Sequence, residues 1–182
     1  MANYVFTRYA IEGKKEVLEK IAEVINSGDG YTLTAIETLG LSTEDLWDGI
    51  KRAEWEKGAR VEERAGKHVL FFTQAYPWAQ EDVIDWVLRE MGDEEAEIYY
   101  VMDLVEENIH ETNDREGKYF PERYTVYVDG AEDEAYFVTY EEALDYVRSQ
   151  LKLSDDYNTI EDIEEYCEDN ELGFLISEIE VN

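Results

Sequence analysis

The sequence predicts a mixed α+β fold, and three observations support this prediction. Stretches in which bulky or β-branched residues alternate with polar ones are separated by stretches whose apolar residues recur at helical spacing. Two pairs of short strand-like segments are joined by turn residues, as in β-hairpins. The 14 Tyr, 6 Phe and 4 Trp among 182 residues can supply a core, which argues against disorder despite the high charge.

The first half of the chain is expected to begin with a strand over residues 4–11 and a helix after Gly13. This helix has one apolar face, formed by Val17, Leu18, Ile21, Val24 and Ile25. Residues 31–39 are ambiguous between a strand and a short helix. An inserted helix is predicted next, between Ser42, which is placed to cap its first turn, and Gly58, just past its end.

A hairpin, a helix and a strand complete this half. The segments ARVEER and HVLFFTQ surround Ala65-Gly66-Lys67 and predict the hairpin. The helix is expected at about Gln80–Met91 and the strand at Glu97–Leu104. Residues 1–104 are therefore expected to form one α+β domain with the order βα, inserted helix, ββαβ.

The second half is expected to contain a polar connecting loop, residues 105–122, and an acidic ββααβ block, residues 123–182. The hairpin of this block lies in TVYVDG and AYFVT. Thr139 and Glu142 form a capping-box pattern that opens one helix, and Thr159 can cap the next. Gly173 is expected to close that helix before the terminal strand FLISEIEV.

Charge is distributed unevenly along the chain, which has 46 acidic and 16 basic residues and a formal net charge of −30. Residues 1–92 carry a net charge of −6, and residues 93–182 carry −24. Such asymmetry suggests an interaction surface. Repulsion disfavours direct binding to nucleic acid or to an anionic membrane, so a partner is expected to be a basic protein.

The segments MANYVFTRYAIEG and FFTQAYPWAQEDVIDWV, in the order βα…ββαβ, resemble a known family. This is the ferredoxin-like domain family of plasmid, phage and other mobile-element proteins typified by YubB. The likeness covers about residues 1–104, although the Trp–Gly feature usual before the aromatic strand is poorly matched by AEWEKGARV. The resemblance implies a ferredoxin-like βαββαβ sheet and a mobile-element setting. It implies no reaction, because the family has no established catalytic residues.

The stretch LSDDYNTIEDIEEYCEDNELG contains nine acidic residues and no basic one. Like charges at i,i+3 and i,i+4 destabilise a helix, so a function outside helix stability is expected to keep this face acidic. The first hypothesis is a non-catalytic inhibitor whose carboxylates imitate nucleic-acid phosphates and occupy a basic cleft, for example in a nuclease. The candidate partner-binding residues are Asp145, Asp155, Asp156, Glu161, Asp162, Glu164, Glu165, Glu168 and Asp169.

Two other hypotheses remain open at this stage. The chain can instead be an accessory or structural module whose acidity serves only solubility, with self-association as a homodimer. An enzyme would require a pocket in which His68 or His110 meets convergent polar groups. We expect no enzyme, because the chain has no Gly-rich phosphate loop and a single cysteine, Cys167, without a basic neighbour.

Neither a cofactor nor a metal site is expected. The two His and Cys167 lack the ligand spacing of a zinc site, and the acidic stretches lack the calcium-loop pattern. The first residues contain no long apolar run, so neither a signal peptide nor a membrane span is expected. The lone cysteine suits a reducing cytoplasm.

Overall fold

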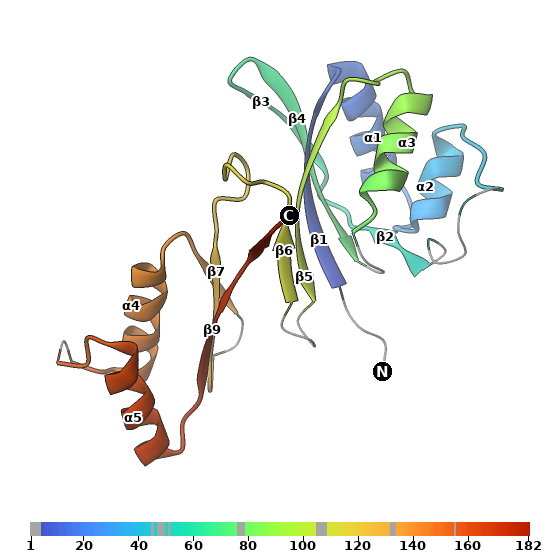
Figure 1. The fold of residues 1–182 in the computed structure, drawn as a ribbon. Helices are drawn as coiled ribbons and strands as arrows, with labels where there is room; N and C mark the ends of the chain where they lie inside the picture. Colours follow the sequence, from blue (N-terminus) through green and yellow to red (C-terminus); the bar gives the residue numbers. More distant parts are fainter. Residues whose placement is uncertain are drawn as a thin grey trace.

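The chain was studied as a computed structural model, which describes residues 5–44, 46, 50, 52–75, 79–104, 109–131, 134–154 and 156–182. These residues contain five helices and ten strands. The strands form two sheets, and the molecule is elongated (Figure 1). The predicted mixed α+β class is confirmed.

The larger sheet contains seven strands. They are β1 (Val5–Gly13), β2 (Glu54–Trp55), β3 (Arg60–Arg64), β4 (Lys67–Ala75), β5 (Glu97–Leu104), β6 (Ile109–Thr112) and β10 (Glu180–Val181). Strand β1 is central and antiparallel to both β4 and β5, so that Tyr9 lies opposite Phe72 on one side and Tyr100 on the other. Strands β3 and β4 form the predicted hairpin.

Three helices cover one face of this sheet (Figure 1). They are α1 (Lys15–Ser27), α2 (Thr32–Thr38) and α3 (Glu81–Glu90). Because side chains alternate along a strand, Tyr9 and Ile11 of β1 and Leu70 and Phe72 of β4 point towards the helices. They form the main core there, with helix side chains such as Leu18 that are fully buried.

The region between α1 and β3 differs from the expected inserted helix. The ambiguous residues 31–39 contain helix α2, whereas residues 45, 47–49 and 51 of the expected helix lie outside the described residues. Its expected end is a strand, β2, which pairs with β4. The Trp55 ring is buried against Phe72, and the backbone N–H of Trp55 donates to the Gly30 carbonyl at 2.8 Å. Tertiary contacts therefore override the helical pattern.

The other face of the larger sheet is covered by the segment after β5 and by the end of the chain. Residues 109–112, expected within a polar connecting loop, form β6, in which His110 lies opposite Asp103. A second apolar cluster on this face contains Ala10, Val69, Phe71, Val101, Phe120 and Ile179.

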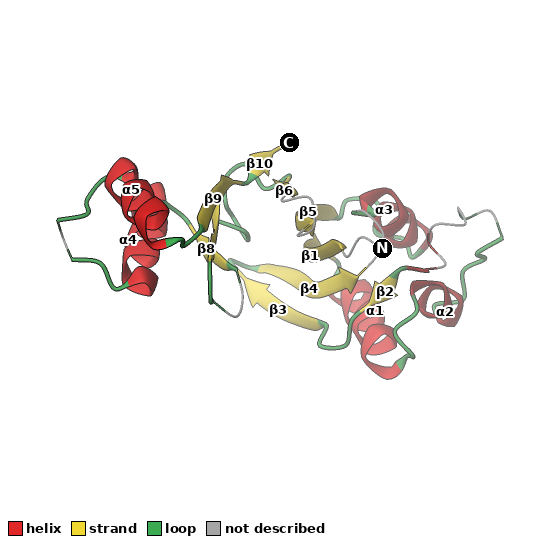
Figure 2. Cartoon of the chain, turned by 90° about the horizontal axis from the view of Figure 1, so that it is seen from below, coloured by secondary structure: helices red, strands yellow, loops and turns green. Residues whose placement is uncertain are grey.

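The smaller sheet has the order β8-β7-β9. Its strands are β7 (Tyr124–Val128), β8 (Ala135–Phe137) and β9 (Phe174–Glu178). Helices α4 (Tyr140–Leu151) and α5 (Ile160–Asn170) pack on it through a core of Val126, Val128, Ala143, Val147, Ile163 and Cys167. Figure 2 shows these two helices at the opposite end of the molecule from α1, α2 and α3.

The expected terminal strand divides in two around Ile179. This residue is buried on the larger sheet, and its N–H donates to the Arg123 carbonyl at 2.8 Å. The last residues then pair as β10 with β6, so the end of the chain ties the two sheets together. No helix in the described residues is long and apolar enough to cross a membrane.

Candidate partner-binding surface

Helix α5 carries most of the predicted partner-binding acids, and both its start and its inner side are firmly held. Thr159 and Asp162 form a capping box in which each accepts a hydrogen bond from the backbone N–H of the other, both at 3.2 Å. Ile163 and Cys167 are buried against the smaller sheet. Asp162 therefore has a structural role that the sequence analysis did not assign to it.

The outward side of α5 carries six carboxylates in two rows. With 3.6 residues per turn, Asp162, Glu165 and Asp169 follow one flank, and Glu161, Glu164 and Glu168 follow the other. The helix contains no Lys or Arg, and all of these acids except Asp162 are exposed. Among the described residues, none of the six has an ion-pair partner. The helix thus presents a continuous acidic surface, which we call the α5 acidic face.

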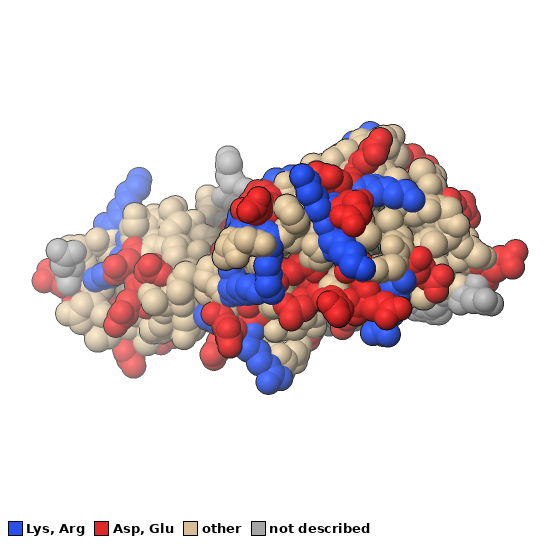
Figure 3. Space-filling view, turned by 90° about the horizontal axis from the view of Figure 1, so that it is seen from above, with Lys and Arg blue, Asp and Glu red and all other residues tan. Residues whose placement is uncertain are grey.

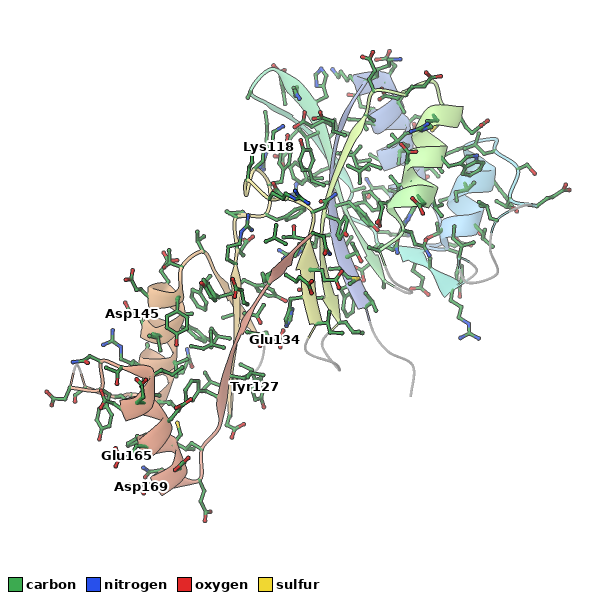
Figure 4. All side chains as sticks on the ribbon, in the orientation of Figure 1. Lys118, Tyr127, Glu134, Asp145, Glu165 and Asp169 are labelled. Atoms are coloured by element: carbon green, nitrogen blue, oxygen red, sulfur yellow. The ribbon has the colours of Figure 1, made fainter. Side chains whose placement is uncertain are left out.

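The first row borders a hollow of about 370 Å³. Asp156 joins Asp162, Glu165 and Asp169 there, beside the rings of Tyr157 and Tyr166. These two rings pack edge to face with centroids 5.4 Å apart. Figure 4 shows Glu165 and Asp169 on this outer helix. Four of the nine predicted carboxylates therefore share one concave wall with two aromatic rings.

The second row lies close to another aromatic side chain, Tyr140. Burial raises the pKa of the Tyr140 phenol, and the carboxylates of Glu161 and Glu164 raise it further. The Tyr140 ring packs on Tyr124 with centroids 5.7 Å apart. Each flank of the α5 acidic face thus combines carboxylates with a fixed ring, a combination that suits an Arg-rich partner.

Of the two remaining predicted residues, Asp145 does not join this surface. Asp145 lies on α4 (Figure 4) and is paired with Arg148, so its charge is partly compensated. Asp155 lies outside the described residues.

A second charged cluster, around Glu12, was missed by the sequence analysis. Glu12 is only 4% exposed, and its carboxylate accepts hydrogen bonds from Lys67 and Tyr119 and pairs with Lys118. Burial opposes the ionisation of Glu12, but the interactions with Lys118, Lys67 and Tyr119 outweigh it and lower the pKa to about 2. Figure 3 shows that Lys and Arg side chains gather mainly over the middle of the molecule on the face seen from above.

This cluster borders a cavity of about 350 Å³ that also contains His68, so the enzyme hypothesis must be weighed there. General acid–base catalysis works best when the pKa lies near the working pH. Glu12 has a pKa of about 2, and the Glu12 carboxylate raises the pKa of Lys67 above its ordinary value. Both groups therefore keep their charge at neutral pH, and their ion pair links β1 to β4.

Metal and thiol chemistry find no support in the described part of the chain. There, no group of three or more His, Cys, Asp or Glu side chains is arranged to hold a metal ion. Cys167 is buried, and burial together with the charge of Asp129 raises the pKa of its thiol.

No protein-family model matches the chain, and searches of curated proteins and of solved structures return no match.

Proposed function

We propose that the protein is a non-catalytic binding protein of inhibitor type, whose α5 acidic face imitates nucleic-acid phosphates. On this proposal it occupies the basic cleft of a nucleic-acid-handling partner such as a nuclease. The protein itself does not bind nucleic acid, because its net charge of −30 repels phosphates.

The observation that supports this proposal most is that α5 carries two rows of carboxylates and no basic residue. Six carboxylates lie on the 11 residues of the helix. At 1.5 Å per residue, this is about one charge per 2.8 Å of axis, between the values for duplex DNA, about 1.7 Å, and for a single strand, about 3.4 Å. The capping box and the buried residues Ile163 and Cys167 hold the helix rigid, which lowers the entropic cost of binding.

We also propose a ferredoxin-like arrangement and a relationship to the YubB-type mobile-element family for the first half of the chain. The strand order β5-β1-β4-β3, with α1 after β1 and α3 after β4, supports this proposal. A mobile element benefits from disabling host nucleases, which is compatible with an inhibitor.

The test is a paired capture experiment from a bacterial lysate, with wild type and a variant that lacks four charges of the face. The variant changes Glu161, Glu164, Glu165 and Glu168 to Gln, which preserves shape. Wild type should retain nucleic-acid-binding proteins, and added duplex DNA should release them, since both compete for one cleft. The variant should lose this retention, chiefly through slower association.

A matched control removes four exposed carboxylates elsewhere, by changing Glu16, Glu23, Glu90 and Glu94 to Gln. This control has the same net charge as the α5 variant and should retain the partner. If both variants lost the partner equally, the binding would depend on net charge alone and not on the α5 acidic face. Unchanged binding by the α5 variant would reject the proposal and leave an accessory module whose acids serve solubility.

A further inference from the structure

A cavity of about 260 Å³ opens on the face of the larger sheet that is not covered by α1–α3. Its charged lining consists of four basic side chains and one acidic one: Arg8, Lys57, Arg60, Arg64 and Glu122. In the whole chain acids outnumber bases by 46 to 16. The cavity lining is therefore mainly basic although the protein as a whole is acidic. Solubility does not explain why basic side chains gather here.

Arg60 and Arg64 are held in place at the cavity by an aromatic ring. Both guanidinium carbons lie over Phe71, at 5.0 Å and 4.5 Å from the ring centroid. Glu62 accepts one N–H from Arg60 and two from Arg64, at 2.7 to 3.0 Å. Stacking uses the flat face of a guanidinium and leaves its in-plane N–H groups able to donate. The N–H groups of Arg60 and Arg64 that do not donate to Glu62 have no other partner among the described residues, so they can bind an anion.

Arg8 and Lys57 add positive charge that is weakly compensated. The Arg8 guanidinium stacks on Phe120 and Tyr136, its Nη2 lies 4.0 Å from the Asp103 carboxylate, and this nitrogen has no hydrogen-bond partner in the described structure. Lys57 is exposed and has no ion-pair partner among the described residues. Glu122 Oε2, on the same wall, is buried without a hydrogen-bond partner there.

The aromatic wall of the cavity, Tyr119 and Phe120, is rigid. Both backbone N–H groups donate to the buried Asp114 carboxylate, at 2.7 Å and 2.9 Å. Arg123 donates to the Phe120 carbonyl at 2.8 Å. A preorganised wall avoids the cost of ordering a loop when a ligand binds.

From these contacts we infer that the cavity binds a small organic anion that carries an aromatic ring. Its phosphate or carboxylate group pairs with Arg60, Arg64 and Lys57, and its ring packs against the Phe and Tyr side chains. A hydroxyl or amino group of the ligand donates to Glu122 Oε2. Nucleoside monophosphates and aryl carboxylates share this chemistry, and the experiment distinguishes them.

The test titrates the full chain with AMP, indole-3-acetate, adenosine and inorganic phosphate, followed by calorimetry and by amide NMR shifts. AMP or indole-3-acetate should saturate one site per chain, and the amides of residues 57–64 and 119–120 should shift. Adenosine and phosphate should each bind about tenfold more weakly or worse, because each lacks half of the contacts. Since the chain repels anions overall, saturable binding reports a built site.

Two variants and a control complete the experiment. The double change Arg60→Gln with Arg64→Gln, and the single change Lys57→Gln, should each weaken binding about tenfold or more. Lys20→Gln, which removes one exposed charge on α1, should leave binding unchanged. Three results would each overturn the inference. The first is that neither ring-bearing anion saturates the protein up to about 1 mM. The second is that phosphate alone binds as tightly as these anions, and the third is that the Lys20 control weakens binding as much as the cavity variants do. If the double variant does not fold, the Lys57 variant decides.

Discussion

Two buried carboxylates, Glu12 and Asp114, fix the segment that follows β6. Glu12 on β1 pairs with Lys67 on β4 and with Lys118 in the segment after β6. Asp114 accepts three backbone N–H groups, from residues 118, 119 and 120, at 2.7 to 2.9 Å. Glu12 therefore attaches the segment 113–120 to the sheet through Lys118 and Tyr119, and Asp114 closes a turn within that segment.

The change Glu12→Gln should lower the free energy of unfolding by about 1–3 kcal/mol at pH 7, since it removes charge-assisted hydrogen bonds from a buried site. A carboxyl whose pKa falls from 4.5 unfolded to about 2 folded stabilises the protein fully above about pH 4.5. This contribution is lost as the pH falls through about 2.

Urea unfolding of wild type and variant from pH 7 to pH 2 measures this effect as a difference. The difference should be constant at neutral pH and should shrink below about pH 4.5. Glu97→Gln is the matched control, because this exposed carboxylate lies 3.5 Å from the same Lys67 ammonium. A Glu12 variant as stable as the Glu97 variant would contradict the assigned role.

The change Asp114→Ala should cost about 2–4 kcal/mol, since it leaves three backbone N–H groups without their acceptor. Hydrogen exchange at residues 118–120 should quicken, while exchange in α1 changes little. Glu116→Ala, an exposed change in the same segment, should have almost no effect. Unchanged exchange at these three amides would show that the segment is held by other contacts.

At the scale of the elements, α5 ends with an unfavourable residue. Glu171 adopts the left-handed conformation, φ 54° and ψ 39°, in which glycine is preferred. Its negative charge also lies at the helix C-terminus, where the dipole disfavours it. Glu171→Gly should therefore raise the stability by about 0.5–1.5 kcal/mol, after the added freedom of the unfolded chain is subtracted.

Thermal unfolding of two variants separates the causes of this effect. Glu171→Gln removes only the charge and should show the smaller gain, because the backbone strain remains. Equal gains in both variants would assign the whole effect to charge, and a loss of stability in the Gly variant would contradict the strain argument.

The elements with strong local signals were predicted well from the sequence. Helix α3 and strand β5 lie where periodicity placed them, and the capping box at Thr139 is present. Gly173, by contrast, does not cap α5. Gly173 instead lies against Asp129: an added Cβ would meet that carboxylate at 2.7 Å, so a larger residue would require the Asp129 side chain to shift.

Elements that depend on distant partners were not predictable. Strand β6 has a polar sequence and exists because it pairs with β5 and receives β10 from the end of the chain. For the candidate surface, helical spacing gave the α5 acidic face. No local pattern indicated that Lys67 and Lys118 would meet at Glu12, because this pairing is set by tertiary packing.

At the scale of the whole molecule, the two halves differ in how many of their acidic side chains are compensated by ion pairs. In the described residues before 123, ion pairs such as Arg89 with Asp85 and Lys67 with Glu12 compensate many acids. In the described residues after 123, Arg148 with Asp145 is the single ion pair. The C-terminal part therefore retains most of its self-repulsion in the folded state.

Moderate salt should for this reason stabilise the protein, and the C-terminal part most. At 0.1 M the Debye length is about 10 Å, so NaCl screens repulsion between the rows of α5 while short ion pairs lose less. The melting temperature should rise from low salt to about 0.15 M NaCl, and hydrogen exchange should slow more in α5 than in α1. The variant with Glu161, Glu164, Glu165 and Glu168 changed to Gln should start from a higher melting temperature and gain less from salt, since like-charge neighbours are already removed. A melting temperature that stays flat or falls with NaCl in the wild type would show that the acids do not destabilise the native fold. The acidic residues of α5 would then cost the fold nothing, and no partner would be needed to explain why they are kept.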